Sequence, residues 1–139
     1  MSASVRISAL FFLLPLPLLA ASGAWSGKSH GGIVSRGQQI LVSHPLTPPA
    51  GLSARATTTG IQWRITLLSP PPLALRIKLC TPERCLQLPG LSGKLNQQLQ
   101  LSPHGPFRFI YSVQHKGQLI PALNVVSNQL TISYQESGQ

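Results

Sequence analysis

The sequence contains no aspartate, and Glu83 and Glu136 are its only acidic residues. Catalysis by paired carboxylates or by a Ser-His-Asp triad needs an acidic side chain close to a nucleophile or to a second acid. Glu83 lies in a predicted turn and Glu136 in the C-terminal tail. The acidic side chains needed for either kind of catalytic site are therefore missing. The same shortage leaves 11 Lys and Arg residues nearly unopposed, and the formal net charge is +9.

Metal and phosphate ligands are also few. The histidines do not occur at i, i+2 or i, i+4 spacing, and no carboxylate stands beside them. The glycines at 31–32 and 90–93 lack the lysine pattern of a phosphate-binding loop. We therefore expect no metal, no cofactor and no enzymatic activity. The four histidines are His30, His44, His104 and His115.

Only one long apolar run is present, from Ala9 to Leu19, and small residues follow it from Ala20 to Ala24. This arrangement is typical of a secretory signal peptide. The run is shorter than the ~20 residues that cross a bilayer, and it contains two prolines, which disfavour a membrane helix. We predict that residues 1–24 are removed and that the protein works outside the cytoplasm, without stable membrane insertion.

The predicted cut falls after Ala21 or Ala24. The remaining residues, 25–139, have the length of one ordinary domain, which is enough to enclose a single hydrophobic core. Trp25 would then stand close to the mature N-terminus. We expect it either to pin the first strand to the domain, which we favour, or to stay exposed for a partner.

Cys80 and Cys85 are the only cysteines, with four residues between them. In an oxidising compartment such a close pair is typical of a disulfide. Both sulfurs fall on the polar phase of alternating segments, and Pro82 between them suits a turn. We predict a hairpin stapled by this disulfide, worth ~2 kcal/mol. A redox motif is the alternative, although that motif has two residues between its cysteines.

Apolar residues recur at every second position along most of the chain after the signal, which predicts β-strands. The pattern, broken by turn signals that include Ser127-Asn128, predicts an all-β, single-domain antiparallel β-sandwich. Clear alternation covers Ile61–Leu67, Leu73–Cys80, Cys85–Leu88, Phe107–Val113 and Leu130–Tyr134. Weaker candidates are Ile33–Ser35, Gln39–Ser43, Leu95–Leu101 and Leu119–Val126, the last with Pro121 as a sign of an edge or a bulge.

Four basic residues lie on the outward phase of three predicted strands: Arg64, Arg76, Lys78 and Arg108. They would form one exposed basic face if those strands belong to one sheet, and otherwise they are solvated side chains on separate faces. A basic face would attract anionic surfaces. Nucleic acid is not an expected partner, because the aromatic residues at 107, 109 and 111 share the core phase and the chain is exported.

Particular strings resemble the flagellar protein FlhE family over nearly all of the mature chain. They are LIPALNVVSNQLTISY (Leu119–Tyr134), LRIKLCTPERCLQL (Leu75–Leu88), WRITLLSPPP from Trp63, and Trp25 followed by GIVSRG (Gly32–Gly37). The resemblance implies a non-enzymatic periplasmic β-sandwich that assists flagellum assembly. It implies a role in limiting proton leak through the flagellar type III export apparatus, or in chaperoning exported flagellar parts, or in both.

An apolar pair beside a proline at a predicted edge strand suggests where such a partner binds. We expect the export apparatus or a rod-type flagellar subunit to dock on an exposed edge at Leu119, Ile120 and Pro121, unless these residues only close the core. Arg64, Arg76 and Lys78 are the rival contact surface. Two alternative functions remain open: a secreted basic module that binds an anionic envelope component, and a fimbrial subunit or its chaperone.

Overall fold

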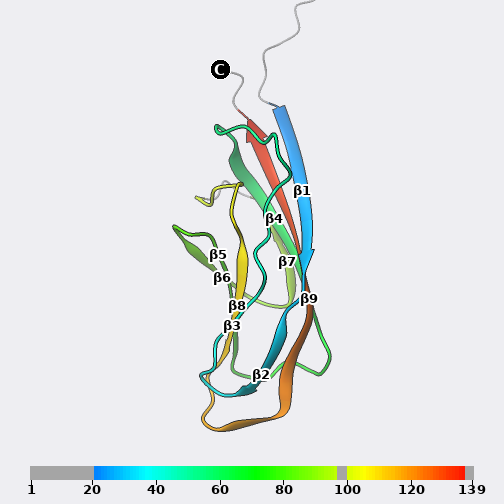
Figure 1. Ribbon diagram of the computed structural model, residues 1–139, viewed down its shortest axis with the longest axis vertical. Helices are drawn as coiled ribbons and strands as arrows, with labels where there is room; N and C mark the ends of the chain where they lie inside the picture. The colour runs from blue at the N-terminus through cyan, green and yellow to red at the C-terminus, as the bar shows by residue number, and fades with distance from the viewer. Residues whose placement is uncertain (1–20, 97–99, 137–139) are drawn as a thin grey trace, which may run out of the picture.

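The computed structural model describes residues 21–96 and 100–136, and these residues form nine β-strands in two antiparallel sheets (Figure 1). The predicted all-β sandwich is therefore confirmed. The strands are β1 (Ala21–Ser29), β2 (Gly32–Arg36), β3 (Leu41–Val42), β4 (Thr57–Leu67), β5 (Leu75–Cys80), β6 (Cys85–Leu88), β7 (Ser92–Leu95), β8 (Arg108–Val113) and β9 (Gln118–Glu136). In this part of the chain no helix is long and apolar enough to cross a membrane.

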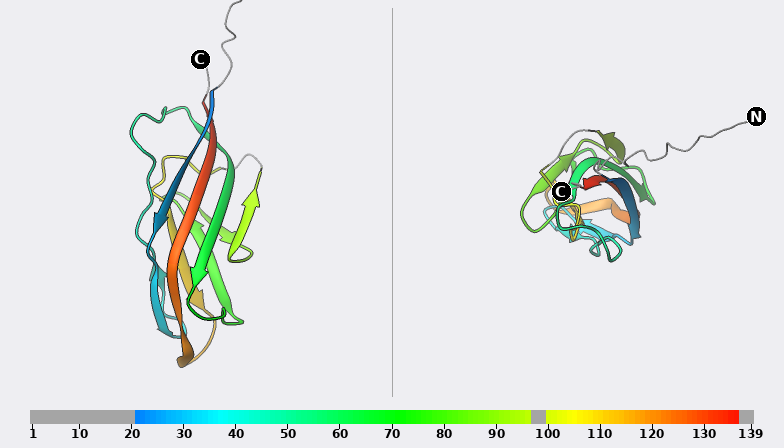
Figure 2. Two further views of the ribbon diagram at one scale, coloured as in Figure 1. Left: turned by 90° about the vertical axis from the view of Figure 1, so that its right-hand side faces the viewer. Right: turned by 90° about the horizontal axis from the view of Figure 1, so that it is seen from above.

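The first sheet has the order β1-β9-β4-β7, and its members lie side by side in the left view of Figure 2. Strand β2 also belongs to this sheet and pairs with the N-terminal half of β9, whereas β1 pairs with the C-terminal half of β9. The second sheet has the order β3-β8-β5-β6. The last strand in the sequence is thus the central scaffold of the first sheet.

The core lies between the two sheets and is built by the predicted alternation. Trp63 of β4 and the β8 residues Phe109 and Tyr111 are at most 2 % exposed, as is Phe107 next to β8. Neighbouring positions on these strands, such as Gln62 and Arg108, are exposed. Each sheet therefore buries one face and leaves the other in water, which is the arrangement that period-two patterning favours.

A polar network joins the two sheets inside this core. The Tyr111 hydroxyl donates to Asn128 Oδ1, and Asn128 Nδ2 donates to Ser29 Oγ at 3.2 Å. The three residues belong to β8, β9 and β1, and Tyr111 and Asn128 have no exposed surface. Burial raises the pKa of the Tyr111 phenol far above its ordinary value, so the phenol stays protonated and remains a donor.

Strand β9 corrects one prediction, the turn at Ser127-Asn128. The chain continues through these residues as one strand, and both are buried. A register shift against β4 lies here, between the pairs Thr66↔Ser127 and Leu67↔Val125. This bulge reverses the alternation of buried and exposed residues, so a continuous strand looks in the sequence like two strands with a break. The Asn128 amide is satisfied by its two side-chain partners rather than by a turn.

The weaker strand predictions have mixed outcomes. Ile33–Ser35 lies within β2, whereas only two residues of Gln39–Ser43 form β3. The prediction for Leu95–Leu101 is wrong where it can be judged: β7 ends at Leu95, Leu101 lies outside any strand, and residues 97–99 lie outside the described residues. Leu73 is also misplaced, because it precedes β5 and is fully exposed. The prolines before it hold the chain out of the sheet.

The disulfide prediction is confirmed. Cys80 and Cys85 are bonded across the end of the β5–β6 hairpin, with an S–S distance of 2.00 Å. In the loop, the Thr81 N–H donates to the Arg84 carbonyl, and the Arg84 N–H donates to the Thr81 hydroxyl. Cys80 is buried although it lies on the outward phase, and Cys85 is exposed.

Candidate interaction surfaces

An apolar groove lies at the end of the sandwich opposite Ala21 and Glu136, at the bottom of Figure 1. One wall is the loop from Pro70 to Ala74, between β4 and β5. The other is the beginning of β9, with Val113 and His115 nearby. The groove has a volume of about 450 Å³. Leu73 and Ile120 are almost fully exposed, and both line this one groove, as apolar residues grouped at an interaction site do.

The structure separates the three residues predicted to dock a partner here. Leu119 is 8 % exposed and belongs to the core, whereas Ile120 is 84 % exposed and Pro121 is also exposed. Between the pairs Val34↔Leu123 and Arg36↔Gln118 the register with β2 shifts, so the extra β9 residues bulge outward. The predicted bulge at Pro121 is confirmed, and it is what turns Ile120 toward solvent.

The opposite wall of this groove was missed by sequence reasoning. The alternating pattern places Leu73 at the start of a predicted strand, on the same phase as Leu75 and Ile77. A signal was nevertheless present, because none of the three prolines directly before Leu73 can donate a hydrogen bond to a sheet.

The exposed side of the first sheet carries a second surface, which we call the polar grid. Residues paired across neighbouring strands form two parallel rows on this side. One row is Lys94, Gln62, Thr131 and Ser26, and the other is Ser92, Arg64, Gln129 and Lys28, each running through β7, β4, β9 and β1. Six of these eight residues line one shallow groove, and all eight side chains are exposed or half-buried.

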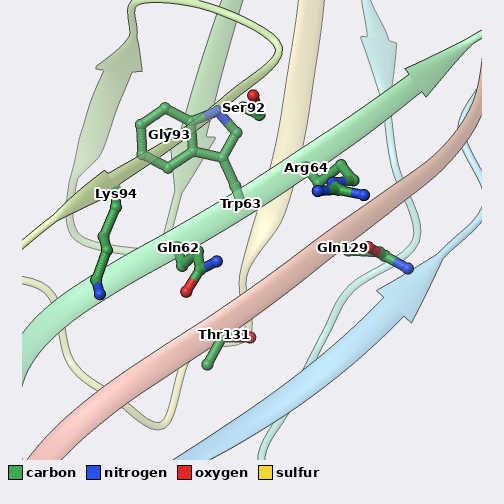
Figure 3. A pocket seen from close by; sticks show the side chains of 8 residues that line it. All are labelled: Gln62, Trp63, Arg64, Ser92, Gly93, Lys94, Gln129 and Thr131. Carbon is green, nitrogen blue, oxygen red and sulfur yellow. The ribbon is translucent and has the colours of Figure 1, made fainter.

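Figure 3 shows how the grid lies on the strands: Lys94, Gln62 and Thr131 follow one another across the sheet, and Arg64 lies next to Gln129. The next row toward the chain ends carries the small residues Ala24, Ser133 and Gly60. Beneath β7, the Trp63 indole packs below Gly93 and donates to the Gly90 carbonyl at 2.9 Å. A rigid sheet therefore supports the polar side chains.

The condition for a single basic face is not met, because the three strands do not belong to one sheet. Arg64 lies on β4 in the first sheet, whereas Arg76 and Lys78 on β5 and Arg108 on β8 lie in the second. The second sheet does gather three of the four residues, since β5 and β8 are neighbours and Cys80 pairs with Arg108. Outward phase along a strand was predictable, but membership of a sheet was not.

Trp25 is buried at 6 % exposure. Its indole nitrogen donates to the Pro103 carbonyl at 2.9 Å, and its ring centroid lies 5.7 Å from that of Phe107. The preferred prediction, that Trp25 pins the first strand, is confirmed.

Of the four histidines, His104 forms a hydrogen bond with Ser102, and no group of three metal-ligating side chains occurs in the described ranges.

The chain matches known proteins over most of its length. Residues 32–135 match the family model of flagellar protein FlhE. Flagellar protein FlhE of Salmonella typhimurium LT2 is 38 % identical over 128 residues, covering 88 % of this chain and 94 % of the relative. The Escherichia coli K12 protein of the same name is 34 % identical over 132 residues, covering 91 % and 98 %.

A solved structure described as the crystal structure of FLHE has the same fold, with a TM-score of 0.76 and 35 % identity. The similarity covers 83 % of this chain and 98 % of the other. All of these relatives are described as flagellar proteins, and none is described by an enzymatic activity.

Proposed function

The chain belongs to the FlhE family of flagellar proteins, and from this premise we propose that it is a non-enzymatic periplasmic accessory of flagellum assembly. The apolar run before residue 20 supports export, and the Cys80–Cys85 disulfide supports an oxidising compartment. Family membership also favours a flagellar role over the fimbrial alternative.

The proposed activity is to hold an exported flagellar subunit in the groove between Pro70–Ala74 and Ile120–Pro121, before that subunit polymerises. The observation that supports this is the exposure of Leu73 and Ile120 on facing walls of one groove. Burying each side chain against a partner would contribute about 1.5–3 kcal/mol. Such a groove suits an apolar ridge of a rod-type subunit.

The rim of the groove indicates the charge of that ridge. His115 lines the groove and Lys116 follows it, while Arg36 pairs with Gln118 at the start of β9. The chain has no carboxylate near this end, because its only acidic residues are Glu83 and Glu136. An apolar ridge flanked by acidic side chains would therefore be favoured.

The test is the double substitution Leu73→Glu with Ile120→Glu. Val42→Glu is the matched control, because Val42 is an exposed apolar residue on β3 in the other sheet. We expect the double variant to bind purified rod-type subunits at least about tenfold more weakly and to fail to restore swarming to a deletion strain. Val42→Glu should behave as the wild type. Full binding and full swarming by the double variant would refute the groove.

A leak-limiting role would use the same groove against the periplasmic mouth of the export apparatus. The two roles are distinguished by cytoplasmic pH in the deletion strain after external acidification. If the double variant acidifies the cytoplasm like the deletion while subunit binding is intact, the groove limits proton leak. If subunit binding is lost and cytoplasmic pH is normal, the chaperone role stands.

A further inference from the structure

The polar grid combines cations with groups that both donate and accept hydrogen bonds. Arg64, Lys94 and Lys28 are its charged members, and the other five are serine, threonine and glutamine. Ser26 Oγ and Thr131 Oγ1 lie 2.8 Å apart and share a hydrogen bond. No member is acidic, so an anion placed on the grid meets only cations and neutral polar groups.

The spacing of the cations restricts the type of anion. Neighbouring strands are about 4.8 Å apart and alternate residues about 6.7 Å, so the Arg64 backbone lies about 8 Å from that of Lys94 and about 10 Å from that of Lys28. Nucleic acid carries one charge per ~3.4 Å of each strand, a much denser pattern. At physiological salt, charges this far apart act nearly independently, because the screening length is about 8 Å.

The neutral members indicate what lies between the charges. Gln62 and Gln129 stand beside the cations in the two rows, where their amides can both donate and accept. The hydroxyl groups of a sugar also donate and accept hydrogen bonds, so they need partners of this kind. Trp63 also lines the shallow groove of the grid, but it is only 2 % exposed and its ring packs against Gly93, so it offers no open face on which a base would stack.

We propose that the polar grid binds an acidic polysaccharide, in which hydroxyl-bearing sugar rings lie between the carboxylates. The Arg64 guanidinium would take one carboxylate, with its planar pair of donors matched to two oxygens. Lys94 or Lys28 would take a neighbouring carboxylate, and the glutamines would bind the hydroxyls between them. This surface is separate from the apolar groove, so the two can be occupied together.

The test uses polygalacturonate, a polymer of carboxylated sugars, at physiological salt. The grid variant is Arg64→Gln with Lys94→Gln, and the matched control is Arg76→Gln with Lys78→Gln, which removes the same charge from the other sheet. All four side chains are exposed, and thermal unfolding verifies that both variants are folded. We expect binding to weaken about tenfold or more in the grid variant and less than about threefold in the control.

Two further probes address the chemistry of the ligand. Neutral dextran should not bind, and polyphosphate should bind more weakly than polygalacturonate with equal losses in both variants. Gln62→Ala with Gln129→Ala should weaken polygalacturonate binding without changing its salt dependence. Equal losses in the two charge variants, tighter binding of polyphosphate, or no binding of polygalacturonate by the wild type would each overturn the proposal. None of these outcomes bears on the Leu73 and Ile120 groove.

Discussion

The buried network of Tyr111, Asn128 and Ser29 allows one prediction to be worked out in detail. In Tyr111→Phe the ring is kept and only the hydroxyl is lost, so the packing of β8 is preserved. In this variant Asn128 Oδ1 no longer accepts a hydrogen bond from residue 111, and Asn128 has no exposed surface at which water could replace the hydroxyl. A buried acceptor left in this state costs about 1–3 kcal/mol.

We expect Tyr111→Phe to lower the free energy of unfolding by about 2 kcal/mol and the melting temperature by about 8 °C, given about 4 °C per kcal/mol for a domain of this size. Tyr134→Phe is the matched control, because Tyr134 lies half-buried near the end of β9 and outside the network. It should change stability by less than about 0.5 kcal/mol. Urea unfolding of the purified proteins measures both.

A double-mutant cycle with Asn128→Leu tests the pairing itself. Replacing both partners by apolar groups of similar shape removes the unsatisfied acceptor, so the double variant should be more stable than the sum of the single losses by about 1 kcal/mol or more. Additive losses would refute the hydrogen bond as the source of the effect. They would leave the loss to be explained by packing.

The dependence on pH gives the network a second signature. Burial holds the pKa of the Tyr111 phenol above its ordinary value, whereas in the unfolded chain the phenol titrates near about pH 10. Above that pH the unfolded state loses a proton that the folded state keeps, so unfolding is favoured. The contribution of Tyr111 is thus complete below about pH 10 and is lost as the pH rises further. The stability difference between wild type and Tyr111→Phe should narrow there, and a constant difference would contradict this account.

Three further predictions concern the hairpin, the support of the polar grid and the N-terminus. Cys80→Ser with Cys85→Ser should lower the unfolding free energy by about 2 kcal/mol, as expected for so short a closed loop, and a loss below about 0.5 kcal/mol in urea unfolding would contradict it. Gly93→Ala should cost about 1–3 kcal/mol, because a Cβ would lie 2.7 Å from the Trp63 ring; Gly90→Ala, where a Cβ meets nothing within 4 Å, is the control. The mass of the exported protein should correspond to a start at Ser22, since Gly23 and Ala24 pair with β9, and a start at Trp25 would show that this part of β1 is dispensable.

The strands that were predicted correctly share a local cause. Over Ile61–Thr66 of β4, Leu75–Leu79 of β5 and all of β8, more buried residues alternate with more exposed ones, as in Ile61, Trp63 and Ile65. One buried face is sufficient to produce this pattern, whatever the neighbouring strands are. The same reasoning predicted the hairpin disulfide, because the two cysteines are close in sequence.

The elements that were missed depend on distant partners. Strand β1 carries mostly small and polar residues, Ala-Ser-Gly-Ala-Trp-Ser-Gly-Lys-Ser, and only Trp25 is of a type enriched in strands. It becomes a strand because it pairs with the far end of the chain, from Ala21↔Glu136 to Ser29↔Asn128. Strand β9 was divided in two because its bulge can be recognised only against β4.

The candidate surfaces follow the same division between local and distant causes. The outward phase of Arg64, Arg76 and Lys78 could be predicted from each strand alone, but strand order separates the first from the other two. That separation leaves Arg64 in one row with Gln129 and beside the row that contains Gln62, rather than in a dense cationic cluster. A dense cluster would attract any polyanion, whereas cations diluted among amides and hydroxyls discriminate by the spacing of charge. Strand pairing puts Arg64 in a different sheet from the other three basic residues. This separation is the physical basis for expecting the polar grid to select its ligand.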